Sequence, residues 1–99
     1  MRRISITCFY NPPYKLEPGR VDKEHLDILI DISPIRSGKI IIALSEYYIN
    51  GMKRRVICEK YGVNPGYLSL KIREVQDLNC RIYKLLPFYI DKMTSLIPD

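Results

Sequence analysis

The sequence predicts an all-α fold, a small helical domain with a central helix-turn-helix. Apolar residues recur every three or four positions along most of the 99 residues, which is the spacing of amphipathic helices. A glycine separates two such runs in the middle of the chain, and the excess positive charge falls in the same segment. A chain of this length forms one domain around a single core.

The first 20 residues are predicted to form an N-terminal arm. Ile4, Ile6, Cys8 and Tyr10 alternate with other residues, which is typical of a short strand or extended segment, before the Asn-Pro-Pro break. A lone strand needs a partner, and the pattern leaves two partners open: the helices of the same chain or another subunit.

Two helices are expected before the hairpin. The first covers about residues 22–32, because acidic residues come early and Leu26, Leu29 and Ile30 share one side. The second begins after Ser37, which can serve as its N-cap, and ends at the following Asn-Gly pair. Its surface is apolar almost all round, so we expect it at the centre of the core or also in a subunit interface.

The helix-turn-helix is predicted from two helices, roughly residues 53–61 and 65–77. Gly62 permits the positive φ of a sharp turn between them. Cys58 offers a small side chain where the second helix crosses the first, so its role is structural. Asn64 can cap the second helix, and the proline after it is acceptable in a first turn.

The outer side of this hairpin is the predicted DNA-binding surface. The inner side of its second helix is filled by Leu68, Ile72 and Val75. Residues 53–73 carry six basic side chains against one acid, Glu59, a concentration that is typical of phosphate binding. The candidate contacts are Lys53, Arg54, Arg55, Asn64, Gly66, Tyr67, Ser69, Leu70, Lys71 and Arg73. Hydroxyl groups among them can donate to phosphate oxygens, and the leucine can contact a thymine methyl group.

Two alternatives to DNA binding remain open. One is a helical hairpin that only packs, since a glycine turn between helices is common. The other is a helical protein-interaction co-regulator, whose basic face binds an acidic partner without direct contact with DNA.

A further helix is predicted after the hairpin. Its apolar stripe consists of Leu78, Ile82 and Leu85. The pattern leaves open whether this helix continues the second hairpin helix or bends near Asn79, and proline is expected to end it at Pro87. We assign residues 21–90 to the DNA-binding domain and residues 91–99 to a C-terminal tail.

The sequence offers no catalytic, metal or cofactor site. His25 has neither a candidate nucleophile nor a second histidine to work with, so an enzyme is not expected. Cys8, Cys58 and Cys80 lie 50 and 22 residues apart, which matches no zinc-binding pattern. No apolar run reaches the length of a transmembrane helix, and the basic start lacks a cleavage site. We therefore expect a cytoplasmic protein with no membrane or small-molecule ligand.

Two segments, "IDISPIRSGKIIIALSEYYINGMKRRVICEKYGVNPGYLSLKIREV" and "LNCRIYKLLPFY", resemble the PapB family of fimbrial, or adhesin, operon regulators from enteric bacteria. The likeness covers roughly residues 26–90, and "VICEKYGVNPGYLS" is its most specific part. It implies a helix-turn-helix transcription regulator that binds A/T-rich DNA upstream of fimbrial genes. It also implies assembly into dimers and larger oligomers on DNA, with activation or repression according to which sites are occupied.

The resemblance implies roles for two residues of the first hairpin helix. Arg54 matches a position needed for DNA binding and is expected to contact DNA, and Cys58 matches a supporting position. The family is described as reading the minor groove, where arginines such as Arg54 and Arg55 suit a narrow A/T-rich groove. The contact expected between Leu70 and a thymine methyl group lies in the major groove instead. Both grooves therefore remain open alternatives.

Overall fold

Four helices make up the part of the chain that the computed structural model describes, residues 15–96, with side chains described up to residue 90. They are α1 (Lys23–Ile32), α2 (Gly38–Tyr48), α3 (Arg54–Tyr61) and α4 (Pro65–Leu96). No β-strand occurs between residues 15 and 96, which confirms the all-α prediction for this range. The arm predicted for residues 1–20 lies mostly outside the described residues.

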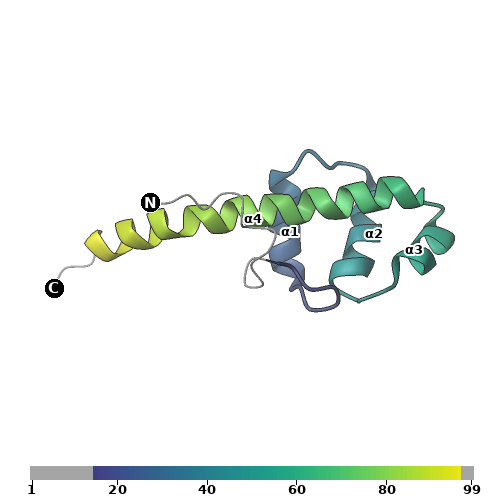
Figure 1. Ribbon diagram of the computed structural model, residues 1–99, viewed down its shortest axis with the longest axis horizontal. Coiled ribbons are helices and arrows are strands. Elements are labelled where there is room, and N and C mark those ends of the chain that lie inside the picture. Colours follow the sequence, from purple (N-terminus) through teal and green to yellow (C-terminus); the bar gives the residue numbers. More distant parts are fainter. Residues whose placement is uncertain (1–14, 97–99) are drawn as a thin grey trace.

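The helix α4 is the longest element and serves as the platform for the others (Figure 1). Its N-terminal half lies against α1 and α2, and the short α3 packs at the end where α4 begins. The remaining half of α4 projects beyond this cluster, so that the protein measures 55 × 26 × 23 Å.

The core lies between α1, α2, α3 and the N-terminal half of α4. Its fully buried large side chains are Leu26, Leu29, Leu44, Tyr48, Ile57, Leu68 and Val75. The Tyr48 hydroxyl group donates a hydrogen bond to the Ile72 carbonyl oxygen at 2.8 Å, so the one polar atom of this ring is satisfied inside the core. Burial raises the pKa of Tyr48 far above its usual value, and the phenol therefore stays neutral.

Two predicted end signals are confirmed around α2. The Ser37 side chain accepts a hydrogen bond from the Ile40 N–H at 3.4 Å, as an N-cap does. Past the other end of α2, Gly51 has a φ of +72° and packs against Gly19, whose φ is +79°. A Cβ atom on Gly19 would lie only 3.1 Å from the Gly51 Cα, so this crossing of two loops requires glycine.

The predicted helix end at Pro87 is wrong. The helix α4 is continuous from the hairpin through residue 79, which settles the open question there, and it passes Pro87 to end at Leu96. Proline inside a helix removes one backbone hydrogen bond and costs about 3 kcal/mol, but its φ is helical. A helix can therefore continue through it where packing offsets the loss. No helix among the described residues is long and apolar enough to span a membrane.

Candidate DNA-binding surface

The hairpin has the turn that the sequence predicts. Gly62 ends α3 with a φ of +66°, and the next N–H, that of Val63, donates to the Cys58 carbonyl oxygen at 3.1 Å. The Asn64 side chain then accepts a hydrogen bond from the Tyr67 N–H at 2.9 Å, so it caps α4. The glycine turn and the asparagine cap are both confirmed.

The helix α3 is held in place by a carboxylate on α2. Glu46 accepts hydrogen bonds from the Tyr61 hydroxyl group and from Asn50 Nδ2, the second at 2.8 Å, and the Lys60 Nζ lies 3.6 Å away. These hydrogen bonds, the one from Tyr61 first, hold the pKa of Glu46 below its usual value. A hydrogen bond with Tyr61 and the nearby carboxylate raise the pKa of Lys60.

Sequence reasoning missed this anchor. Asn50 follows Glu46 by four residues, just past the end of a mostly apolar helix, which is a visible local signal. Tyr61 lies 15 residues further along, and no local pattern links it to Glu46.

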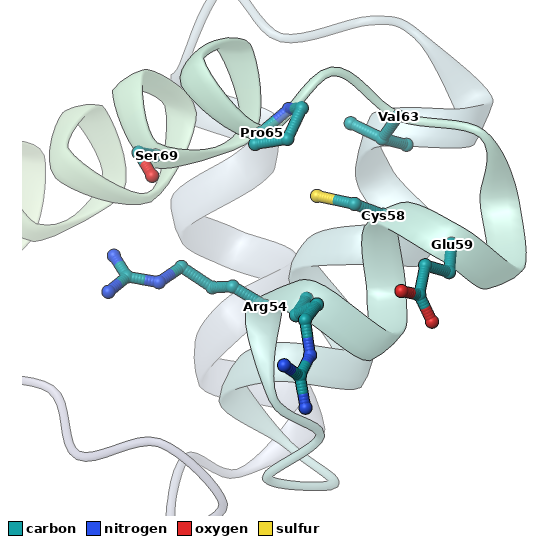
Figure 2. A pocket seen from close by; sticks show the side chains of 7 residues that line it. Arg54, Cys58, Glu59, Val63, Pro65 and Ser69 are labelled. Atoms are coloured by element: carbon teal, nitrogen blue, oxygen red, sulfur yellow. The ribbon is translucent and has the colours of Figure 1, made fainter.

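A hollow of about 500 Å³ separates the start of α3 from the start of α4 (Figure 2). It is lined by Arg54, Arg55, Cys58, Glu59, Val63, Pro65 and Ser69. The half-buried Cys58 directs its sulfur atom toward Pro65, at the place where the two helices approach each other. The structure therefore brings Arg54, Arg55 and Ser69 to one hollow, although they come from two helices.

The basic residues at the start of α3 form no ion pair within the described part of the protein. Lys53, Arg54 and Arg55 are exposed, and no acidic side chain among the described residues forms an ion pair with them. Arg73 is also exposed and follows Ser69 by one turn of α4, so it continues the same side. We call Lys53, Arg54, Arg55 and Arg73 the basic surface.

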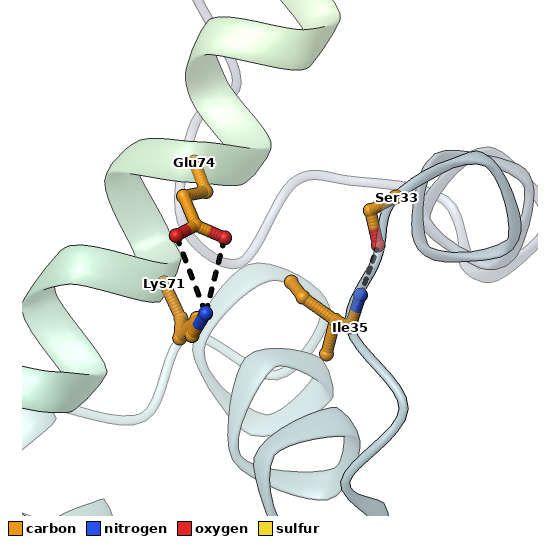
Figure 3. Close-up of polar contacts among 4 residues, drawn as sticks. All are labelled: Ser33, Ile35, Lys71 and Glu74. Carbon is orange, nitrogen blue, oxygen red and sulfur yellow. Dashed lines mark hydrogen bonds and ion pairs between the residues drawn. The ribbon is translucent and has the colours of Figure 1, made fainter.

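Lys71 lies on the other flank of α4. Its Nζ is 3.2 Å from a Glu74 carboxylate oxygen (Figure 3). The same Nζ lies 5.1 Å from the centre of the Tyr67 ring. The side chain is only 18% exposed and borders a separate hollow beside Ser33 and Pro34, after α1. The structure thus does not bring Lys71 and Tyr67 to the side of Arg54, and the Lys71 charge is already paired.

Gly66 and Leu70 lie between these two flanks, on the outward ridge of α4. Leu70 is 50% exposed, and Gly66 precedes it by about one turn. A Cβ atom at Gly66 would lie 3.3 Å from the capping oxygen of Asn64, so the glycine leaves room for the cap.

The comparisons with known proteins agree in pointing to one family. The sequence matches the family described as adhesin biosynthesis transcription regulatory protein, PapB, over residues 1–89. It is 49% identical to the regulatory protein FanB of Escherichia coli over 87 residues, 86% of this chain and 88% of FanB. It is 36% identical to the major pilus subunit operon regulatory protein PapB of Escherichia coli over 80 residues, 81% of this chain and 77% of PapB.

A solved structure shows the same arrangement of helices. The crystal structure of Escherichia coli FocB superimposes with a TM-score of 0.72 at 32% identity and covers 86% of this chain and 97% of FocB. The resemblance seen in the central segment thus extends to the fold. The chain belongs to the PapB family of adhesin biosynthesis transcription regulatory proteins.

Proposed function

We propose that this protein regulates transcription of a fimbrial or adhesin operon by binding double-stranded, A/T-rich DNA in the promoter region through its helix-turn-helix. It acts as a dimer or larger oligomer in the cytoplasm. The observation that carries the proposal is the basic surface, because its four cations are exposed beside the hairpin and have no acidic partner among the described residues.

Pairing inside the protein separates the basic surface from four other basic side chains of the helices. Lys23, Lys60, Lys71 and Arg81 each lie within 4 Å of a carboxylate of the same chain. A paired cation gives up its partner before it can neutralise a phosphate, so it contributes less to DNA affinity. The unpaired cations at the start of α3 release counterions from DNA at no such cost.

The hairpin supplies the remaining contacts. Asn64, Gly66 and Ser69 stand in the first turns of α4, where backbone N–H groups and short polar side chains suit phosphate oxygens. Leu70 would contact a base methyl group if α4 enters the major groove, whereas Arg54 and Arg55 would carry the recognition in a narrow minor groove. Tyr67 and Lys71 contact DNA only if it also covers the second flank of α4.

The relatives indicate which genes are regulated. One of them is named for the major pilus subunit operon and another for the F1845 adhesin operon, both in Escherichia coli. A fimbrial or adhesin operon is therefore the target that we propose for this chain.

The alternative, a co-regulator that binds protein instead of DNA, draws on a different observation. The projecting end of α4 exposes Phe88 and Tyr89 at 68% and 58%, which suits a protein contact. This surface lies far from the basic surface along α4, so one protein can use both.

Fluorescence anisotropy at low salt separates the two functions. We expect binding to a labelled A/T-rich promoter duplex, weaker binding to a G/C-rich duplex of equal length, and displacement by unlabelled A/T-rich duplex. Poly-glutamate is the control competitor, because it carries negative charge but lacks the grooves of a DNA duplex. If no duplex binds at low salt, or poly-glutamate competes as well as DNA at equal charge, the DNA-binding proposal is wrong.

A further inference from the structure

The described part of the chain begins at the side of α4. The Gln76 side chain binds both backbone polar groups of Leu16, because it accepts a hydrogen bond from the N–H at 3.0 Å and donates one to the carbonyl oxygen at 2.8 Å. Leu16 is buried at 5% exposure. Lys15 and Leu16 also border a hollow of about 340 Å³ with Ile82 and Leu86. The chain is thus attached to α4 where the projecting half of this helix begins (Figure 1).

Cys80 lies on the same flank of α4, one turn beyond Gln76. Its side chain is buried at 4% exposure, although it lies outside the cluster of side chains that forms the core. Cys80 is disulfide-bonded, whereas Cys58 is a free cysteine. The sequence contains three cysteines, so the partner that remains for Cys80 within one chain is Cys8.

The length of chain before Leu16 is sufficient for this bond. Cys8 precedes Leu16 by eight residues, which span up to about 26 Å when extended. Cys80 lies only about 6 Å beyond Gln76 along the helix axis, and disulfide-bonded cysteines have Cα atoms about 4.4–6.8 Å apart. The excess length requires a reversal of the chain, and the Asn-Pro-Pro sequence of residues 11–13 is typical of a turn.

We propose that Cys8 and Cys80 form a redox-sensitive disulfide that fixes residues 1–14 to the flank of α4. The proposal uses the cytoplasmic location of the proposed function but not DNA binding. Thiols are normally reduced in the cytoplasm, and a disulfide that forms there usually opens and closes with the redox state. In the reduced state, the Gln76 hydrogen bonds to Leu16 would hold the beginning of the described chain without a covalent bond to α4.

The alternation in the N-terminal sequence fits this place on α4. In an extended segment Ile4 and Ile6 point to the same side as Cys8, so a disulfide to α4 turns both toward the helix. Leu16 already covers the flank at Gln76, which leaves the direction toward Tyr83. Residues 4–8 span about 13 Å when extended, and they therefore cover roughly two turns of α4 beyond Cys80.

The disulfide forms by exchange with a small disulfide oxidant such as glutathione disulfide. The Cys8 thiolate attacks one sulfur atom of the oxidant, which gives a mixed disulfide and releases one glutathione thiolate. The Cys80 thiolate then attacks the Cys8 sulfur atom and releases the second glutathione thiolate. The two protons lost by the cysteines are taken up by the released thiolates, so two thiols are oxidised and one glutathione disulfide is reduced to two glutathione molecules.

The first test is alkylation of the full-length protein in denaturant, after equilibration with glutathione disulfide or with a reductant, followed by peptide mass spectrometry. After oxidation we expect alkylation of Cys58 alone and a pair of peptides joined through Cys8 and Cys80. After reduction all three cysteines should be alkylated. A Cys80 that is alkylated after oxidation, or that is bonded to glutathione, to Cys58 or to a second chain, overturns the inference.

Thermal unfolding gives a second measurement. A disulfide that closes the long loop from residue 8 to residue 80 should raise the midpoint of unfolding by about 10 °C or more in the oxidised protein relative to the reduced one. Cys80 is buried on α4, so the bond is removed at the other cysteine: Cys8→Ser should abolish the shift. Cys58→Ser is the matched control and should keep the shift, because Cys58 is free.

Equal midpoints for the oxidised and reduced wild type, or a shift that Cys8→Ser retains, overturn the inference. Neither measurement contains DNA, so the two proposals fail independently. A protein that forms the disulfide but binds no duplex would refute the proposed function alone, and a protein that binds duplex but joins no Cys8 to Cys80 would refute this inference alone.

Discussion

Replacing both arginines at the start of α3 tests whether the basic surface contacts phosphate. In R54A/R55A two exposed, unpaired cations are lost from the mouth of the hollow between α3 and α4. Each phosphate contact contributes about 0.9 to the slope of log K against log salt. The double variant should therefore lower the slope by about 1.8 and weaken binding about 60-fold at 0.1 M salt, or roughly 2.4 kcal/mol.

The assay is a titration of labelled promoter duplex by fluorescence anisotropy at salt concentrations from 0.05 to 0.2 M. The ratio of wild-type affinity to variant affinity should fall about 12-fold from the lowest to the highest salt concentration, because counterion release contributes less at higher salt. Lys23→Ala removes a cation that Asp27 already pairs on α1, and it should leave the slope unchanged. A folded R54A/R55A with the wild-type slope would show that these arginines do not contact phosphate.

Three further predictions concern how the hairpin is held. Asn64→Ala removes the capping hydrogen bond that the Asn64 side chain accepts from the Tyr67 N–H. Denaturant titration should show the free energy of unfolding lowered by about 1 kcal/mol, with Asn64→Ser close to wild type. In Gly62→Ala the added Cβ atom meets no atom within 4 Å, so only the φ of +66° is unfavourable. We expect the free energy of unfolding to fall by about 1–2 kcal/mol, and by less in Gly62→Asn. An unchanged stability would contradict this. Glu46 has a lowered pKa, so it stabilises the fold above its usual pKa near 4.5 and loses this contribution as the pH falls through its folded-state value. Thermal unfolding should therefore show Glu46→Gln less stable than wild type at pH 7 and the difference disappearing in acid, whereas a constant difference would exclude Glu46 as its source.

Local signals in the sequence were sufficient for most of the fold. Ser37, Gly62 and Asn64 act through neighbours within a few residues, so their roles as cap, turn and cap could be predicted. The helix end predicted at Pro87 is wrong because a proline removes only one backbone hydrogen bond from a helix. Whether the helix continues depends on packing, which the local sequence does not reveal.

The candidate site was predictable in composition but not in arrangement. The sequence predicts one surface for the ten candidate residues, but α4 turns Lys71 and Tyr67 to the flank opposite Arg54. The pairing of Lys71 with Glu74, three residues away, was visible as a possible ion pair. The contact between Glu46 and Tyr61 depends on how α3 docks on α2, which only the three-dimensional structure shows.

The length of α4 sets the distance between the hairpin and the exposed apolar end of the protein. From Pro65 to Leu86 the helix advances 21 residues, about 32 Å at 1.5 Å per residue. A protein bound at the apolar end near Leu86 would be held about 32 Å from the start of α4, close to one turn of B-DNA. A contact made there would fall about one helical turn away from the DNA at the hairpin, and the number of residues in α4 would set that interval.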